Sequence, residues 1–254
     1  MRGRGLVLVV ALLVAGCSGF DTGSVGDPAH TSSTSPPGVG NGVTNASALI
    51  TAHERSFTGT GAVIVTTSAR RSNVPDVTNR STRTTIQASS DGVTLTRERV
   101  KLPSGSRRVS TWRDGVRGVQ RSSAIDGPSI VSPTLTRSRR YRSDKLGHWL
   151  SAGEYSVVAT EDGTPRRYIL TGTGYQPADG PLEADTVQFQ AEAVVTSDGR
   201  VTAFTATLVT VVENKWGKQR RVRSFSYRVR ETGAIGVTRP EWISSETPAA
   251  TEGP

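Results

Sequence analysis

Apolar residues recur at a helical spacing in two segments of the chain. In residues 44–57, the positions i, i+3, i+4, i+7 and i+11 share one helix face and hold Ala46, Leu49, Ile50, His53 and Phe57. Thr44 or Asn45 can cap this helix at its start. Residues 143–151 predict a second helix, because positions i, i+3 and i+4 hold Leu146, Trp149 and Leu150. We expect His53 to pack in the core rather than to bind a metal.

Elsewhere, apolar and polar residues alternate with the two-residue period of β-strands. Four Asp-Gly pairs, at 91–92, 114–115, 162–163 and 198–199, separate consecutive runs and are typical of tight hairpin turns. The pattern predicts an antiparallel meander of about nine or ten strands, which twists and curls as an open sheet. The predicted strands cover residues 62–67, 83–89, 93–100, 108–113, 116–121, 155–160, 166–171, 187–196, 201–212 and 220–230.

These elements together predict an α+β fold of one domain over residues 44–243. A curved antiparallel sheet, shaped as a half-barrel, would hold one or two helices on its concave face. Residues 17–43 are rich in Ser, Thr, Gly and Pro, so we predict a disordered tether there. Residues 244–254 are polar and predict a disordered tail.

The first residues of the chain have the pattern of a secretion signal. Arg2 and Arg4 are followed by an apolar run that is too short to span a bilayer, which needs about 20 apolar residues. The run ends with Val-Ala-Gly before Cys17, which resembles the lipobox of lipoproteins, whose cysteine takes the lipid. We therefore predict a signal peptide over residues 1–16. Lipid attached at Cys17 would then anchor the chain to the extracellular face of the cell membrane.

The overall composition restricts the chemistry of the chain. A single cysteine excludes an internal disulfide and a zinc site built on cysteine pairs. The formal net charge of +9, from 31 basic and 22 acidic residues, favours anionic partners. Because the chain is predicted to be exported, nucleic acid is not an expected partner.

Two clusters of basic residues are candidate contacts with anionic surfaces. One interpretation is binding to lipid headgroups or surface polymers, with Tyr141 and Trp216 as interfacial anchors. The other is a solvated loop and a charged edge strand that resists aggregation. The clusters contain Arg137, Arg139, Arg140 and Arg142 in the first and Arg220 and Arg221 in the second.

Sequence signatures of catalysis are missing from the chain. It has no Gly-x-Ser-x-Gly, His-Glu-x-x-His or Walker motif, so we predict no enzyme activity, no cofactor and no metal site. A Ser-His-Asp triad is assembled in space, so sequence spacing does not test for one. Asn79 and Asn45 begin N-glycosylation sequons, and Asn79 is the better candidate because it lies in a polar loop.

Several of these motifs resemble haloarchaeal surface lipoproteins of unknown function. The resemblance rests on the lipobox, the low-complexity spacer, and residues 36–49, 191–205 and 236–242. It covers most of the chain from Cys17 to Trp242. That family in turn looks like the LolA and LppX half-barrels, which implies a fold that holds an acyl chain between a curved sheet and helices.

We consider two functions, of which the first is what the resemblance implies. The first is a lipid-anchored, non-enzymatic cell-surface lipoprotein whose half-barrel binds lipid or another apolar ligand. The alternative is an envelope-organising lipoprotein with a filled core, which contacts anionic surface polymers through its arginine clusters. An apolar cavity of the size of known ligand pockets, roughly 300–1,000 Å³, would favour the first function over the second.

Overall fold

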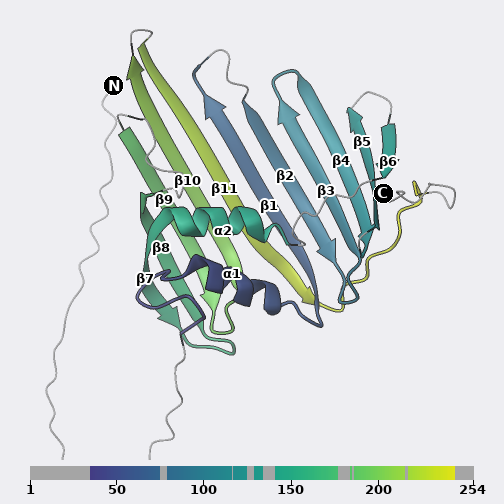
Figure 1. Cartoon of the computed structure of the whole chain (residues 1–254), viewed down its shortest axis with the longest axis horizontal. Helices are drawn as coiled ribbons and strands as arrows, with labels where there is room; N and C mark the ends of the chain where they lie inside the picture. The colour runs from purple at the N-terminus through teal and green to yellow at the C-terminus, as the bar shows by residue number, and fades with distance from the viewer. Residues whose placement is uncertain are drawn as a thin grey trace, which may run out of the picture. The chain divides into compact units, whose positions relative to one another are not determined.

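Within the residues that the structure describes, eleven strands form one open antiparallel sheet with two helices (Figure 1). This computed structural model describes residues 35–74, 79–115, 117–124, 129–133, 141–176, 184, 186–214 and 217–243. In these ranges, neither helix is long and apolar enough to cross a membrane. The predicted signal peptide, Cys17 and the tail 244–254 lie outside the described residues.

The sheet order is β6-β5-β4-β3-β2-β1-β11-β10-β9-β8-β7. Neighbours in the sheet are also neighbours in the sequence, except β1 and β11, whose pairing joins the two halves. The strands are β1 (Gly61–Ser72), β2 (Arg80–Ala88), β3 (Thr94–Leu102), β4 (Gly105–Asp114), β5 (Arg117–Ala124), β6 (Ser129–Pro133), β7 (Gly153–Glu161), β8 (Arg167–Tyr175), β9 (Thr186–Thr196), β10 (Val201–Asn214) and β11 (Gly217–Gly233).

The predicted meander is confirmed, with one strand more than expected. Each of the four Asp-Gly pairs lies in the turn between two paired strands: β2–β3, β4–β5, β7–β8 and β9–β10. The sequence analysis missed β6, which is only 5 residues long and too short to establish an alternation. Gly199, in the β9–β10 turn, has φ +85°, and a Cβ there would lie 2.5 Å from the Cβ of Ala52.

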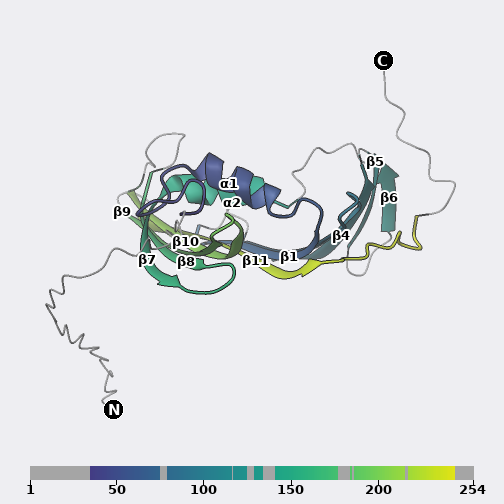
Figure 2. The same ribbon diagram turned by 90° about the horizontal axis from the view of Figure 1, so that it is seen from below.

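Both helices lie on the same face of the sheet (Figure 2). In α1 (Ala46–Arg55), the Asn45 side chain accepts a hydrogen bond from the Ala48 N–H at 2.9 Å, so the predicted cap is confirmed. The second helix, α2 (Ser143–Ala152), begins where expected. The Ser143 hydroxyl donates a hydrogen bond to the Glu54 carboxylate and so links the two helices.

The core lies between the helices and one face of the sheet, here called the helix face. Alternate residues of the central strands point into it and are buried beneath the helices, whereas their neighbours point to the opposite, outer face. The buried side chains form one cluster, and protein interiors are in general close-packed. The largest fully buried members of this cluster include Leu49, Phe57, Ile64, Ile86, Leu146, Leu150, Leu170, Phe204, Leu208 and Tyr227.

The packed part of the chain begins before the expected boundary at Thr44. Val39 is buried in the core cluster, and the Asn41 carbonyl accepts a hydrogen bond from the Val157 N–H at 2.8 Å. Gly42 lies so close to β7 that a Cβ there would be 1.7 Å from the Tyr155 carbonyl oxygen. Residues 36–43, expected in the tether, therefore pack on the sheet domain.

Candidate functional site

A groove of about 860 Å³ opens between α2 and the helix face of β1, β2, β3 and β11. Its volume is within the range of roughly 300–1,000 Å³ that is usual for ligand pockets. We call it the α2 groove. From the helix it is lined by Arg142, Asp144, Lys145, His148 and Trp149, and from the sheet mainly by Arg70, Arg80, Glu98, Leu102, Arg223 and Phe225.

Cationic side chains dominate the polar part of the groove. Five basic and two acidic residues line it, a net charge of +3 with His148 neutral. Three of the arginines face one another across the sheet, because Arg70 on β1 pairs with Arg80 on β2 and with Arg223 on β11. Like charges directly opposite one another in a sheet are destabilising. A bound anion would offset this repulsion.

Arg142 links the start of α2 to the sheet. Its guanidinium forms an ion pair with the Glu98 carboxylate at 2.9 Å, and Arg80 approaches the same carboxylate at 3.9 Å. Arg142 is the one described non-glycine residue with positive φ, at 56°, a conformation that costs roughly 1–3 kcal/mol. The side chain of Glu98 is 17% exposed and is shared between two arginines, so it neutralises only part of the local positive charge.

Lys145 adds a further cation on the same helix. Burial lowers its pKa, and the positive charge of Arg142 lowers it further, while Glu98 and Asp144 act in the opposite direction. The net effect of burial and of the neighbouring charges is therefore to disfavour the charged form of Lys145. An anion in the groove would reverse this balance and raise the pKa of Lys145.

One wall of the groove is aromatic. The Trp149 ring is nearly parallel to Phe225, with centroids 6.4 Å apart and planes at 5°, and to Phe189, at 6.1 Å and 8°. Trp149 and Phe225 also line the groove, so its apolar wall continues into the core. The groove therefore combines cations with apolar surface.

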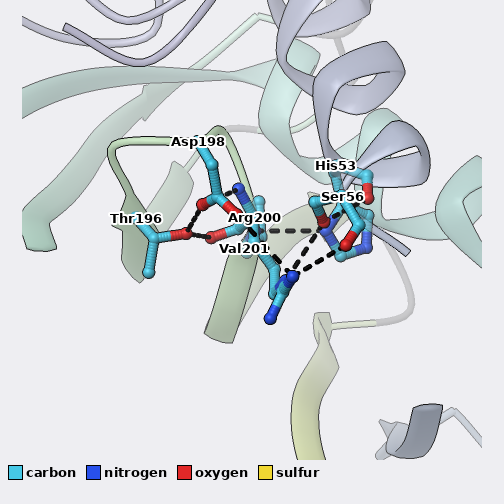
Figure 3. Close-up of polar contacts among 6 residues, drawn as sticks. All are labelled: His53, Ser56, Thr196, Asp198, Arg200 and Val201. Carbon is cyan, nitrogen blue, oxygen red and sulfur yellow. Dashed lines mark hydrogen bonds and ion pairs between the residues drawn. The ribbon is translucent and has the colours of Figure 1, made fainter. Parts of the chain in front are cut away.

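A second polar cluster surrounds His53 at the end of α1 (Figure 3). The His53 Nδ1 atom accepts a hydrogen bond from the Val201 N–H at 3.1 Å, and Nε2 bonds to the Tyr227 hydroxyl at 2.8 Å. Since Nδ1 accepts, the neutral ring carries its proton on Nε2. Burial lowers the pKa of His53 to about 3, and the nearby Arg200 contributes in the same direction.

This cluster joins α1 to the β9–β10 hairpin and does not form a catalytic triad. The Ser56 hydroxyl donates to the backbone carbonyl of His53, and Arg200 donates to Ser56 at 2.7 and 3.1 Å. Asp198 accepts from the Thr196 hydroxyl and forms an ion pair with Arg200 at 3.6 Å. Because both ring nitrogens of His53 bond to other groups, neither serves a nucleophile. The expected core role of His53 is confirmed.

The structure places only some of the candidate residues from the first arginine cluster. Arg142 lies in the α2 groove, whereas Arg137, Arg139, Arg140 and the lipid-attachment candidate Cys17 lie outside the described residues. Tyr141, an interfacial anchor in one of the two interpretations, is 5% exposed and packs against Phe57 with ring centroids 4.6 Å apart. That interpretation is wrong for Tyr141, because this residue is part of the core.

The remaining candidates are separate from Arg142. Arg220 and Arg221 lie on β11, and within the described ranges no hydrogen bond or ion pair joins them to Arg142. Trp216, the other anchor in that interpretation, is not among the described residues. Asn45 is exposed and caps α1, and Asn79 is exposed and accepts a hydrogen bond from the Ser72 N–H at 2.7 Å.

Sequence reasoning missed most of the groove. Arg223 occupies the same alternating face of β11 as Phe225 and Tyr227, so its inward direction is readable from the strand pattern. The sequence does not show that Arg70 and Arg80 lie beside Arg223. Arg70 is opposite Arg80 through the register of β1 with β2, and opposite Arg223 through the register of β1 with β11. No group of described residues has the composition and geometry of a metal site.

Comparison with known proteins gives likenesses of fold only. No family model and no curated protein matches the chain. A solved LolA superfamily protein from Nitrosomonas europaea is 12% identical and covers 78% of this chain and 99% of its own, with a TM-score of 0.29. LprF from Mycobacterium bovis is 10% identical, covers 80% and 99%, and has a TM-score of 0.41. The function proposed below therefore rests on the side chains of this protein.

Proposed function

We propose that this protein is a lipid-anchored, non-enzymatic cell-surface lipoprotein whose domain binds an amphipathic anion in the α2 groove. The observation that carries the proposal is the meeting of the Arg80–Arg70–Arg223 row with the Trp149–Phe225 wall in one groove. Acylation at Cys17 would hold the domain at the extracellular face of the membrane.

The lining of the groove defines the class of ligand. Arg70, Arg142 and Arg223 can donate charge-assisted hydrogen bonds to a phosphate or carboxylate head. Leu102, which is 36% exposed, and the largely buried Trp149 and Phe225 form an apolar lining for a short part of an attached chain. Since side chains fill the core beneath the helices, a wholly apolar ligand deep inside the sheet is a poorer fit than an anionic lipid at its edge.

The filled core also supports the alternative function. An envelope-organising lipoprotein needs no pocket, and its arginines would contact an anionic polymer from outside. The two functions differ in what the protein retains on isolation, because a polymer lying on exposed arginines is released by salt. A lipid whose chain packs on Trp149 is retained.

Native mass spectrometry of the membrane-extracted protein tests the proposal, with identification of any molecule retained. We expect an anionic lipid at one copy per chain. Replacing Arg70→Gln and Arg223→Gln removes two charge-assisted hydrogen bonds and should lower retention about tenfold or more. The matched control is Arg166→Gln with Arg167→Gln, which removes the same charge from arginines paired at the β7–β8 turn.

Two outcomes would contradict the proposal. Unchanged retention in the Arg70 and Arg223 variant would place the lipid elsewhere. Equal loss in the control would show a dependence on net charge alone. Neither variant should unfold the protein, because the first relieves like-charge repulsion and the second breaks exposed ion pairs.

A further inference from the structure

The outer face of the sheet carries a second row of arginines, on different strands from the first. Arg83 on β2 lies directly opposite Arg99 on β3, which lies directly opposite Arg108 on β4. All three side chains are exposed. In the part of the chain that the structure describes, none of them forms an ion pair. This arrangement destabilises the sheet unless an anion lies across it.

Further basic residues extend this row in a second direction. Arg97 and Lys101 flank Arg99 on the outward positions of β3, and Arg228 and Arg230 lie on β11. Among the outward positions of β2, β3 and β4, Asp114 is the one acidic residue. Strands are about 4.8 Å apart, and residues four apart along a strand are separated by roughly 14 Å. The charges therefore form a two-dimensional array, here called the arginine face: Arg83, Arg97, Arg99, Lys101, Arg108, Arg228 and Arg230.

A depression of about 200 Å³ lies at the edge of this array. Arg83, Arg228 and Arg230 line it, and the arginine row continues across it as Thr67, Ser226 and Thr205 in direct register. Guanidinium groups bind phosphate through paired N–H donors, and hydroxyl groups donate to the remaining oxygens. Glu192 follows Thr205 in the same row and marks the end of the cationic surface.

We propose that the arginine face is a docking surface for a membrane of anionic phospholipids, with one headgroup phosphate held in the depression. A linear polyanion can follow the row across the strands or the line along β3, but not both. A layer of headgroups meets all seven basic side chains together. In this orientation, α1, α2 and the α2 groove face away from the bilayer, because they lie on the opposite face of the sheet.

Vesicle co-sedimentation of the full chain with Cys17→Ser tests docking without the acyl group. Binding is compared between vesicles of phosphatidylglycerol with phosphatidylcholine and vesicles of phosphatidylcholine alone, at about 0.1 M salt, where the Debye length is about 10 Å. The apolar N-terminal segment contributes to binding of both kinds of vesicle, so its contribution cancels in the ratio of the two affinities. Each basic residue near an anionic surface adds roughly fivefold to binding.

The test variant is Arg83→Gln, Arg99→Gln and Arg108→Gln together, which should lower the affinity ratio about a hundredfold. The matched control, Arg55→Gln, Arg166→Gln and Arg167→Gln, removes the same charge from other elements and should lower the ratio less than tenfold. An equal fall of the affinity ratio in both variants, or no fall in the first, overturns the proposal.

Tighter binding to soluble heparin than to anionic vesicles also overturns the proposal, because it would favour a linear polymer as the partner. Lipid retention in the α2 groove is measured separately, so the two proposals can fail independently.

Discussion

At the scale of single residues, the neutral side chain of His53 links α1 to the sheet through two hydrogen bonds. Its two ring nitrogens bond to Val201 on β10 and Tyr227 on β11, which lie far from it in sequence. Protonation would break the bond that Nδ1 accepts and would place a charge beside Arg200 in a buried site. The hydrogen bond from Val201 to His53 therefore forms only while the ring is neutral.

This predicts an acid-sensitive fold. The pKa of His53 is about 3 when folded and near 6.5 when unfolded, so the unfolded chain binds the extra proton between these values. The contribution of His53 to stability is complete above about pH 7 and is lost as the pH falls towards 3. Between pH 7 and pH 5 the loss is about 2 kcal/mol. Urea unfolding across this range measures it.

A pair of variants isolates the effect. His53→Gln should lower stability at pH 7 and flatten the dependence between pH 7 and pH 5. Asn45→Ala weakens the same helix without removing a titrating group, so it should lower stability equally at pH 7 and pH 5. A variant at His53 that keeps the full slope would show that another group titrates.

At the scale of elements, helix α1 is stabilised by a local capping residue and by packing in the core. Asn45 caps it, and its buried residues Leu49 and Ile50 belong to the core cluster. Its capping residue is also the first residue of a sequon, so a single side chain is a candidate for two roles.

Replacing Asn45→Ala should lower the free energy of unfolding by about 1 kcal/mol, because the Ala48 N–H loses its partner. Asn45→Ser should retain most of the stability, since serine also caps helices. Ser47→Ala removes the sequon but leaves the cap. If this last variant lost as much stability as Asn45→Ala, the cap would not be the cause.

At the scale of the whole molecule, one sheet presents arginine rows on both faces. The helix face combines Arg70, Arg80 and Arg223 with aromatic side chains, whereas the outer face presents arginines beside hydroxyl groups. The first arrangement suits a single amphipathic anion and the second an extended anionic surface. Anchoring at Cys17 would keep the domain beside the membrane, and in the proposed docked orientation the outer face is toward the bilayer and the α2 groove is away from it.

The anchor itself is tested by cell fractionation. With Cys17→Ser, the protein should leave the membrane fraction after a wash with about 1 M salt, which reduces the Debye length to about 3 Å and screens the arginine face. The unmodified sequence should remain, because acyl chains resist salt. A Ser18→Ala control should behave like the unmodified sequence. Retention of the Cys17 variant after the wash would mean that another part of the chain holds the membrane.

Much of the fold could be predicted from local pattern. The Asp-Gly turns and the alternation between them specify hairpins, since the residues that pair across a short turn are close in sequence. The i, i+3, i+4 spacing of Ala46, Leu49 and Ile50, and that of Leu146, Trp149 and Leu150, predicts the two helices and their buried faces. The short strand β6 was missed because a few residues do not establish a period.

The sequence by itself determined which side chains share a face of each strand, because alternation is a local property of extended backbone. It did not determine which strands lie side by side when they are distant in sequence. Arg70 and Arg223 meet through the pairing of β1 with β11, and Arg142 meets Glu98 through the placement of α2 on the sheet. Only the tertiary structure decided these contacts, because the register is set by the packing of the whole core. Of the two clusters that are contiguous in sequence, Arg142 is the one described arginine that lines the groove, while the arginine rows on both faces exist only in the folded sheet.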